Sequence, residues 1–182
     1  LAEPPSASLA GTLELVYSVE DDHGVVSARG IIESAEQAGT DARPLYEAPE
    51  LQLPLPRARA RTGIAQVNRD LSSHPWAGSR VTLTLEATDD PGRKGYSEPF
   101  EMTLPGRTFR DPMARALVEQ RRIVALDANR ATYAARLLDA VTARPDAFPV
   151  PAGVYLPLRS AYRILATSQD DDRLREAADM LW

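Results

Sequence analysis

The sequence predicts an all-β region followed by an all-α region: an antiparallel β-sandwich of the immunoglobulin or fibronectin type, then a short α-helical bundle. From Thr12 to Leu104, apolar side chains recur at every second position in short runs separated by turn residues, which is typical of half-buried antiparallel strands. From Pro112 onwards they recur at every third or fourth position, which is typical of amphipathic helices. We therefore expect a sandwich domain over residues 1–107 and a helical domain over residues 108–182.

The first two strands are expected to form a hairpin. The inward face of the first strand would carry Leu13, Leu15, Tyr17 and Val19. Asp21–Gly24 supply turn chemistry, with Gly24 able to take a positive φ, and residues 25–32 would then be the returning strand. Residues 33–49 are polar and are expected to form a long connection.

Three further regions have strand character. Leu51, Leu53 and Leu55 alternate, but Pro54 and Pro56 remove hydrogen-bond donors, so this strand is expected at a sheet edge and to be followed by another over residues 57–67. The clearest inward row consists of Val81, Leu83, Leu85 and Ala87. After a turn at Asp89–Gly95, the last strand would carry Phe100, Met102 and Leu104.

Four helices are expected after residue 107. Asp111 before Pro112 is a helix start signal, and the first helix would reach about Leu126. The second, third and fourth helices are predicted from the apolar stripe Ala134, Leu137, Leu138 and Val141, from the run that begins at about Pro157, and from the stripe Leu174, Ala177, Ala178, Leu181 and Trp182 after Asp170–Asp172. Because the last stripe includes the final residue, we expect the chain to be an excised fragment whose fourth helix is truncated.

Composition excludes several kinds of chemistry. The chain has no cysteine, which excludes disulfides, thiolate metal sites and a cysteine nucleophile. Its net charge of −5 disfavours nucleic-acid binding, which depends on basic surface. Glycine-rich phosphate loops and nucleophile motifs are missing, and no apolar run approaches the roughly 20 residues that span a bilayer. We therefore expect no catalytic residues, no cofactor and no metal.

The most distinctive local feature is a stripe of three arginines, Arg57, Arg59 and Arg61, which alternate with Ala58 and Ala60. Alternation places all three arginines on one face of a strand, where an anionic ligand could lie along them. The alternative, which we favour, is an edge strand that its charges protect from aggregation.

Two turns carry neighbouring carboxylates, Asp21 and Asp22 beside His23 in one, and Asp89 and Asp90 in the other. Either could hold a cation, but neither matches the spaced ligands of a calcium loop. We favour local hydrogen bonds to backbone amides. His23 and the second histidine, His74, belong to no recognisable catalytic motif.

Three stretches carry a family resemblance: VEDDHGVVSARG (residues 19–30), DPMARALVEQRRIVALDANR (residues 111–130) and YLPLRSAYRILATSQDDDRLREAADMLW (residues 155–182). With them, residues 11–182 resemble part of a family of long, membrane-anchored alphaproteobacterial proteins known only as a domain of unknown function. Family members are similar in having N-terminal transmembrane helices, a large region outside the cytoplasm and a Gln- and Gly-rich tail. The resemblance implies a position on the periplasmic side of the inner membrane and offers no catalytic residues.

Three hypotheses about function follow. The leading one is a non-catalytic, extracytoplasmic interaction or structural module of a membrane-anchored envelope protein, with a protein or envelope component as its partner. The second is a ligand-binding module for an anionic or glycan envelope component, which would use the arginine stripe. The third is a hydrolase that acts on envelope polymers with a carboxylate site, and its test is a cleft with convergent acidic or His residues.

Overall fold

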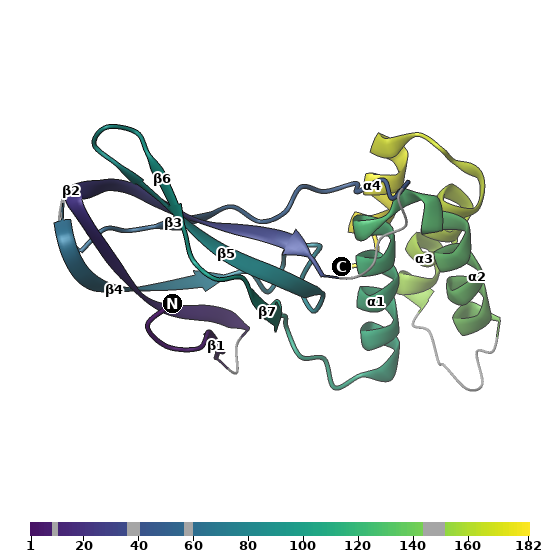
Figure 1. Cartoon of the computed structure of the whole chain (residues 1–182). Helices are drawn as coiled ribbons and strands as arrows, with labels where there is room; N and C mark the ends of the chain where they lie inside the picture. Colours follow the sequence, from purple (N-terminus) through teal and green to yellow (C-terminus); the bar gives the residue numbers. More distant parts are fainter. Residues whose placement is uncertain (9–10, 36–40, 57–59, 144–151) are drawn as a thin grey trace. The chain divides into compact units, whose positions relative to one another are not determined.

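The computed structural model describes residues 1–8, 11–35, 41–56, 60–143 and 152–182. The chain divides into two compact units, one made of Leu1–Gln37 with Ala48–Arg107 and the other of Ala38–Glu47 with Thr108–Trp182. The first is an antiparallel β-sandwich and the second is a helical bundle (Figure 1). This confirms the predicted order of an all-β and an all-α region.

Seven strands form the sandwich within the described residues: β1 (Ser6–Ala7), β2 (Thr12–Ser34), β3 (Leu51–Leu53), β4 (Ala60–Asp70), β5 (Arg80–Asp89), β6 (Lys94–Tyr96) and β7 (Phe100–Thr103). All pairings are antiparallel, and β2 is the central strand. Its first half pairs with β1 and β4, and its second half pairs with β3 and β5. The far side of β5 pairs with β6 and β7. As predicted, the proline-flanked strand β3 lies at an edge.

The predicted hairpin at Asp21–Gly24 is wrong. The chain does not reverse there, because β2 continues through this segment as a single strand of 23 residues. Gly24 has the expected positive φ of 88°, but it lies at an irregularity within the strand and not in a hairpin turn. The register against β4 shifts there, between Glu20 and Val25. The two halves of β2 do not pair with each other because β4 takes up the first half and β5 the second.

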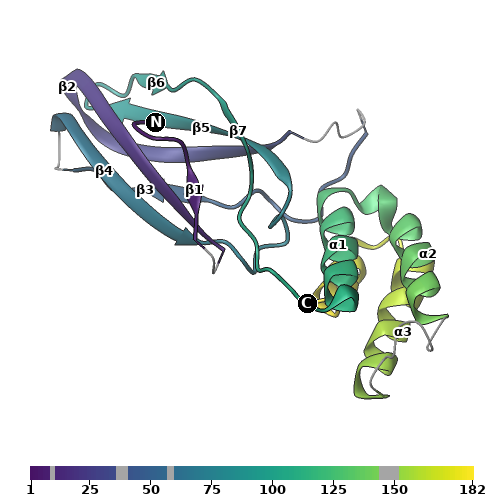
Figure 2. The same cartoon turned by 90° about the horizontal axis from the view of Figure 1, so that it is seen from below.

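The bend in β2 gives the sandwich its two layers (Figures 1 and 2). The inward rows predicted from alternation are largely buried, with Leu13, Leu15, Val81 and Leu83 at 0–1% exposure. The layers are joined across the core by the Tyr17 hydroxyl, which donates a hydrogen bond to the carbonyl of Pro54 just after β3. Residues far apart in the sequence therefore share one apolar interior.

The helical unit contains four α-helices: α1 (Pro112–Leu126), α2 (Ala131–Thr142), α3 (Ala152–Thr167) and α4 (Asp171–Asp179). Both α1 and α3 pack against α2 and α4, so each helix has two neighbours. The predicted start signals are confirmed, because Asp111 Oδ1 accepts from the Ala114 amide at 2.8 Å and Asp170 Oδ1 accepts from the Arg173 amide at 2.9 Å. No helix among the described residues is long and apolar enough to cross a membrane.

Two predicted helix boundaries are wrong. The third helix begins at Ala152, and Pro157 lies inside it. Proline removes one hydrogen bond to the carbonyl of Gly153, which is tolerated here because residues 153–157 are all exposed and water can satisfy that group. The fourth helix ends at Asp179 with Met180 as its C-cap, so it does not run through Trp182.

The connection between β2 and β3 was expected to be a polar loop, but its residues 41–47 form a strap on the helical unit. Leu45 is 3% exposed and belongs to the helical core. Its amide donates to the Ala125 carbonyl at 3.0 Å, and its carbonyl accepts from Arg175 Nε at 2.8 Å. Arg43 adds an ion pair with Asp171. The helical unit is therefore assembled from two separate parts of the chain.

Tyr46 in the strap predicts a pH dependence for the helical unit. Its hydroxyl bonds the Arg175 carbonyl at 3.2 Å and Asp179 Oδ1 at 3.0 Å. Burial, helped by Asp179, raises the pKa of Tyr46 to about 12. The unfolded chain loses this proton first, near its ordinary pKa of about 10, so the contribution of Tyr46 to stability is present below pH 10 and lost as pH rises toward 12.

We therefore expect Tyr46→Phe to flatten the alkaline loss of stability. The measurement is urea unfolding of the native chain and the variant between pH 8 and pH 12, with Tyr133→Phe, in an exposed position on α2, as the control. Parallel curves for the native chain and Tyr46→Phe would contradict the assignment.

Candidate functional site

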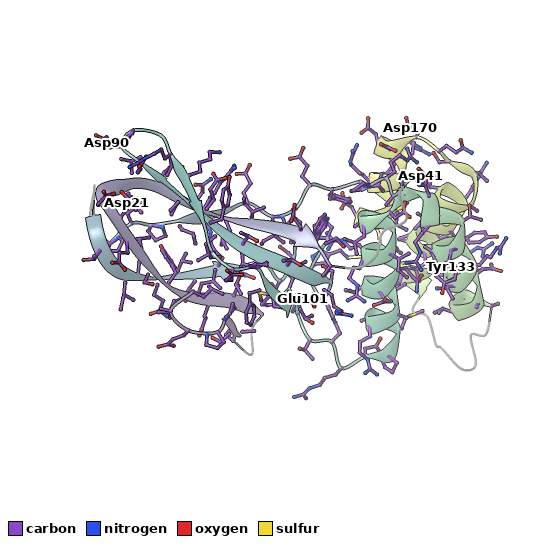
Figure 3. All side chains as sticks on the ribbon, viewed as in Figure 1. Asp21, Asp41, Asp90, Glu101, Tyr133 and Asp170 are labelled. Atoms are coloured by element: carbon purple, nitrogen blue, oxygen red, sulfur yellow. The ribbon has the colours of Figure 1, made fainter. Side chains whose placement is uncertain are left out.

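The sandwich unit contains a cleft of about 480 Å³ where β2 bends. We call it the bend cleft. Its walls come from residues of β2 between Tyr17 and Ala28, from Leu53 of β3, and from residues 85–89 and 93–97 of the β5–β6 hairpin. Leu1 also lines it. Figure 3 shows Asp21, near the bend, and Asp90, at the turn after β5, at the same end of the sandwich.

The floor of the bend cleft is apolar. Tyr17, Val19, Val25 and Leu53 line it and are at most 8% exposed. The floor stays open because two small residues, Ala28 of β2 and Ala87 of β5, lie directly opposite each other in the β2–β5 register.

One wall of the cleft is organised around Glu86, whose side chain is 7% exposed. Arg29 lies opposite it in the register and binds it with two hydrogen bonds, Nε to Oε1 at 2.9 Å and Nη2 to Oε2 at 3.2 Å. Lys94 Nζ approaches Oε1 to 3.3 Å. The hydrogen bond from Arg29, with smaller contributions from Lys94 and Tyr96, holds the pKa of Glu86 below its ordinary value.

Another part of the rim is the turn between β5 and β6, which Asp89 and Arg93 close. Asp89 Oδ1 accepts from the Arg93 amide at 2.6 Å, and Oδ2 accepts from Arg93 Nε at 2.7 Å. The hydrogen bond and charge of Asp89 raise the pKa of the Arg93 guanidinium, with smaller effects from Asp22 and Asp21. Asp21 and Asp22 of β2 and Asp89 at the end of β5, which are far apart in the sequence, thus all act on one arginine.

These contacts are better suited to binding than to proton transfer. A general acid needs a carboxyl group whose pKa is raised toward neutrality. Glu86 has the opposite shift, and both oxygens of Asp89 are engaged by Arg93. An apolar floor with a few fixed polar groups at its rim is instead the usual composition of a ligand site.

The side chains of the predicted arginine stripe lie outside the part of the chain that the structure describes. Arg57 and Arg59 lie outside the described residues, and of Arg61 the structure describes the backbone, in β4, but not the side chain. The stripe therefore remains a prediction.

The other candidates from the sequence have local roles where their side chains are described. His74 Nδ1 accepts from the Trp76 amide at 3.1 Å, which is a turn contact. The side chain of His23 lies outside the described part of the chain. Across the described ranges, no three His, Asp or Glu side chains are grouped so that they could hold a metal ion.

Sequence reasoning missed Tyr17, Glu86 and Tyr96, which line the bend cleft, and Arg29, which binds Glu86 without lining the cleft itself. Alternation placed Tyr17 in the core and gave no reason to single out the other three. Their convergence depends on the β2–β5–β6 register, where Glu86 lies opposite both Arg29 and Tyr96.

A model of one protein family matches residues 1–182, the whole chain. The chain belongs to the family described as Domain of unknown function (DUF4175). Searches of curated proteins and of solved structures found no match to this DUF4175 chain. The geometry of the bend cleft is therefore the main guide to what the DUF4175 chain does.

Proposed function

We propose that the chain is a non-catalytic interaction module whose working surface is the bend cleft. The observation that carries the proposal is the combination of an apolar floor with charged groups that are already paired. Glu86 is held by Arg29 and Lys94, and Asp89 by Arg93. Charges fixed in this way can orient a ligand without being consumed by a reaction, and this favours the interaction module over the carboxylate hydrolase.

Filling the cleft tests this proposal. Ala87→Trp places a large side chain on the floor, whereas Ala166→Trp adds the same group at an exposed position of α3 and serves as the matched control. The intact chain and both variants would be immobilised and exposed to envelope extract, after circular dichroism has shown that both variants are folded. We expect Ala87→Trp to lose the partner that the native chain and Ala166→Trp retain. Equal retention by all three would remove the cleft from consideration.

A glycan is the second candidate ligand, and one observation favours it. Tyr96 is 60% exposed at the rim, next to Lys94 and close to Arg93, so a flat aromatic surface adjoins several hydrogen-bonding groups. Sugar rings pack their C–H faces on such surfaces while their hydroxyls bond nearby polar groups. Titration of the isotope-labelled chain with soluble peptidoglycan fragments should then shift the amide signals of residues 94–97. Shifts confined to other residues would count against a glycan in this cleft.

We also propose that the module belongs to a membrane-anchored alphaproteobacterial parent and lies on the periplasmic side of the inner membrane. The resemblance of residues 19–30, 111–130 and 155–182 supports this setting, and the absence of cysteine is compatible with it. Protease added to spheroplasts should cleave the chain within the intact parent; protection from protease would contradict the periplasmic position.

A further inference from the structure

The outer edge of β4 is the longest open strand edge in the described part of the sandwich. Within the described residues, β4 pairs with β2 and with no other strand. Its register against β2 is regular from Thr62 to Asp70, so its backbone is extended and has no bulge over this length. An edge strand presents a row of N–H and C=O groups that another strand can pair with.

The middle of this edge, between Arg61 and Arg69, lacks the usual protection. Residues 62–68 contain no charged residue and no proline. Ile64 is 69% exposed in the middle of the strand. Proteins normally blunt such edges with lysine, proline, a bulge or a covering element. The middle of β4 is regular and uncharged and exposes a β-branched residue. Such an edge is suited to pairing with another strand.

We propose that β4 is a self-association edge, on which two copies of this chain pair their β4 strands antiparallel about a two-fold axis at Gln66. The inference is independent of the bend cleft, because none of residues 62–68 lines that cleft. The sandwich would then continue from one copy into the next through hydrogen bonds between main chains.

The register follows from the side chains. In a symmetric antiparallel pair, opposing side chains must point to the same face of the sheet, so an axis at Gln66 sets Ile64 opposite Asn68 and Thr62 opposite Asp70. These pairs contain no like charges, the Thr62 hydroxyl can donate to Asp70, and the two Gln66 amides can bond each other.

Neighbouring registers are worse. An axis at Ala65 would set residues 61 and 69, both arginine, opposite each other. An axis at Val67 would set Ile64 against Asp70. A second copy of the chain therefore fits this edge in one register better than in the neighbouring ones. This match favours a second copy as the partner over an unspecified peptide.

Cysteine scanning can read this register directly because the chain has no native cysteine. Opposing Cβ atoms in an antiparallel pair lie about 4.5–5.5 Å apart, within reach of a short thiol cross-linker. We expect Gln66→Cys to form a covalent dimer with itself. Ile64→Cys and Asn68→Cys should not react alone but should join each other in an equimolar mixture. Tyr133→Cys, exposed on α2, controls for random collision.

Sedimentation equilibrium on the intact chain gives the second readout. The double variant Ile64→Lys with Asn68→Lys places two lysine pairs across the axis, and we expect it to weaken the dimer at least about tenfold. Mixing it with Ile64→Glu/Asn68→Glu should restore association. The proposal would be overturned if the native chain stays monomeric at high micromolar concentration, or if the two lysine substitutions leave the dimer unchanged. A monomeric chain whose β4 edge binds a different polypeptide would also overturn it.

Discussion

Leu45→Ala in the intact chain is expected to lower the free energy of unfolding of the helical unit by about 2–4 kcal/mol. Leu45 is 3% exposed in the core made by the four helices, although its place in the sequence is between two strands of the sandwich. Truncation removes buried apolar surface and leaves a cavity, because the surrounding helices can relax only in part. The strap would also lose the anchor that aligns its backbone with Ala125 and Arg175.

Urea unfolding followed by helical ellipticity measures this effect. The matched control is Leu156→Ala in α3, because Leu156 is 71% exposed and its removal should change stability by less than about 0.5 kcal/mol. A similar, small effect of both substitutions would mean that the strap rests on the helices without contributing to their core.

Gly11→Ala is expected to destabilise the sandwich by about 2–4 kcal/mol, since two separate penalties add. Gly11 has φ of +87°, which an L residue rarely adopts. A Cβ atom there would also lie 2.9 Å from the Gly106 carbonyl oxygen and 3.0 Å from Ser72 Cβ. Because Gly106 belongs to the backbone, it cannot rotate away as a flexible side chain would.

Two other glycines separate these penalties. Gly92 has φ of +86° with nothing within 4 Å, so Gly92→Ala should show only the backbone term of about 1–2 kcal/mol. Gly95 has neither constraint, and Gly95→Ala should be close to neutral. Unfolding would be followed by the fluorescence of Trp76 in a Trp182→Phe background. Equal effects at Gly11 and Gly92 would show that the approach to Gly106 is not tight.

Local signals in the sequence predict most of the secondary structure. Alternation identifies the buried rows of β2 and β5, and the aspartates at positions 111 and 170 mark the starts of α1 and α4. These features depend on neighbouring residues alone. The hairpin at Asp21–Gly24 fails because its turn residues serve equally well as a bulge inside a long strand. Only the pairing of β2 with both β4 and β5 decides between the two.

Long-range pairing also explains what the sequence could not predict about the site. Glu86 reads as an ordinary outward residue of a strand until the register sets Arg29 and Tyr96 beside it. Asp21 and Asp89 are separate turn residues until the bend in β2 brings both near Arg93. The position of the strap could not be predicted for the same reason. Leu45 is a single apolar residue in a polar connection, and nothing in its local sequence indicates that it packs in a helical core.

The most direct test of the central claim, that the bend cleft binds a partner, is photo-cross-linking from within the cleft. Tyr96, exposed at the rim, would be replaced by p-benzoylphenylalanine in the protein in living cells, and Tyr133, exposed on α2, would be replaced in the same way as the control. Irradiation should give one discrete cross-linked product from position 96 that Ala87→Trp abolishes, and none from position 133. No product from position 96, or one that survives Ala87→Trp, would contradict the assignment of the cleft.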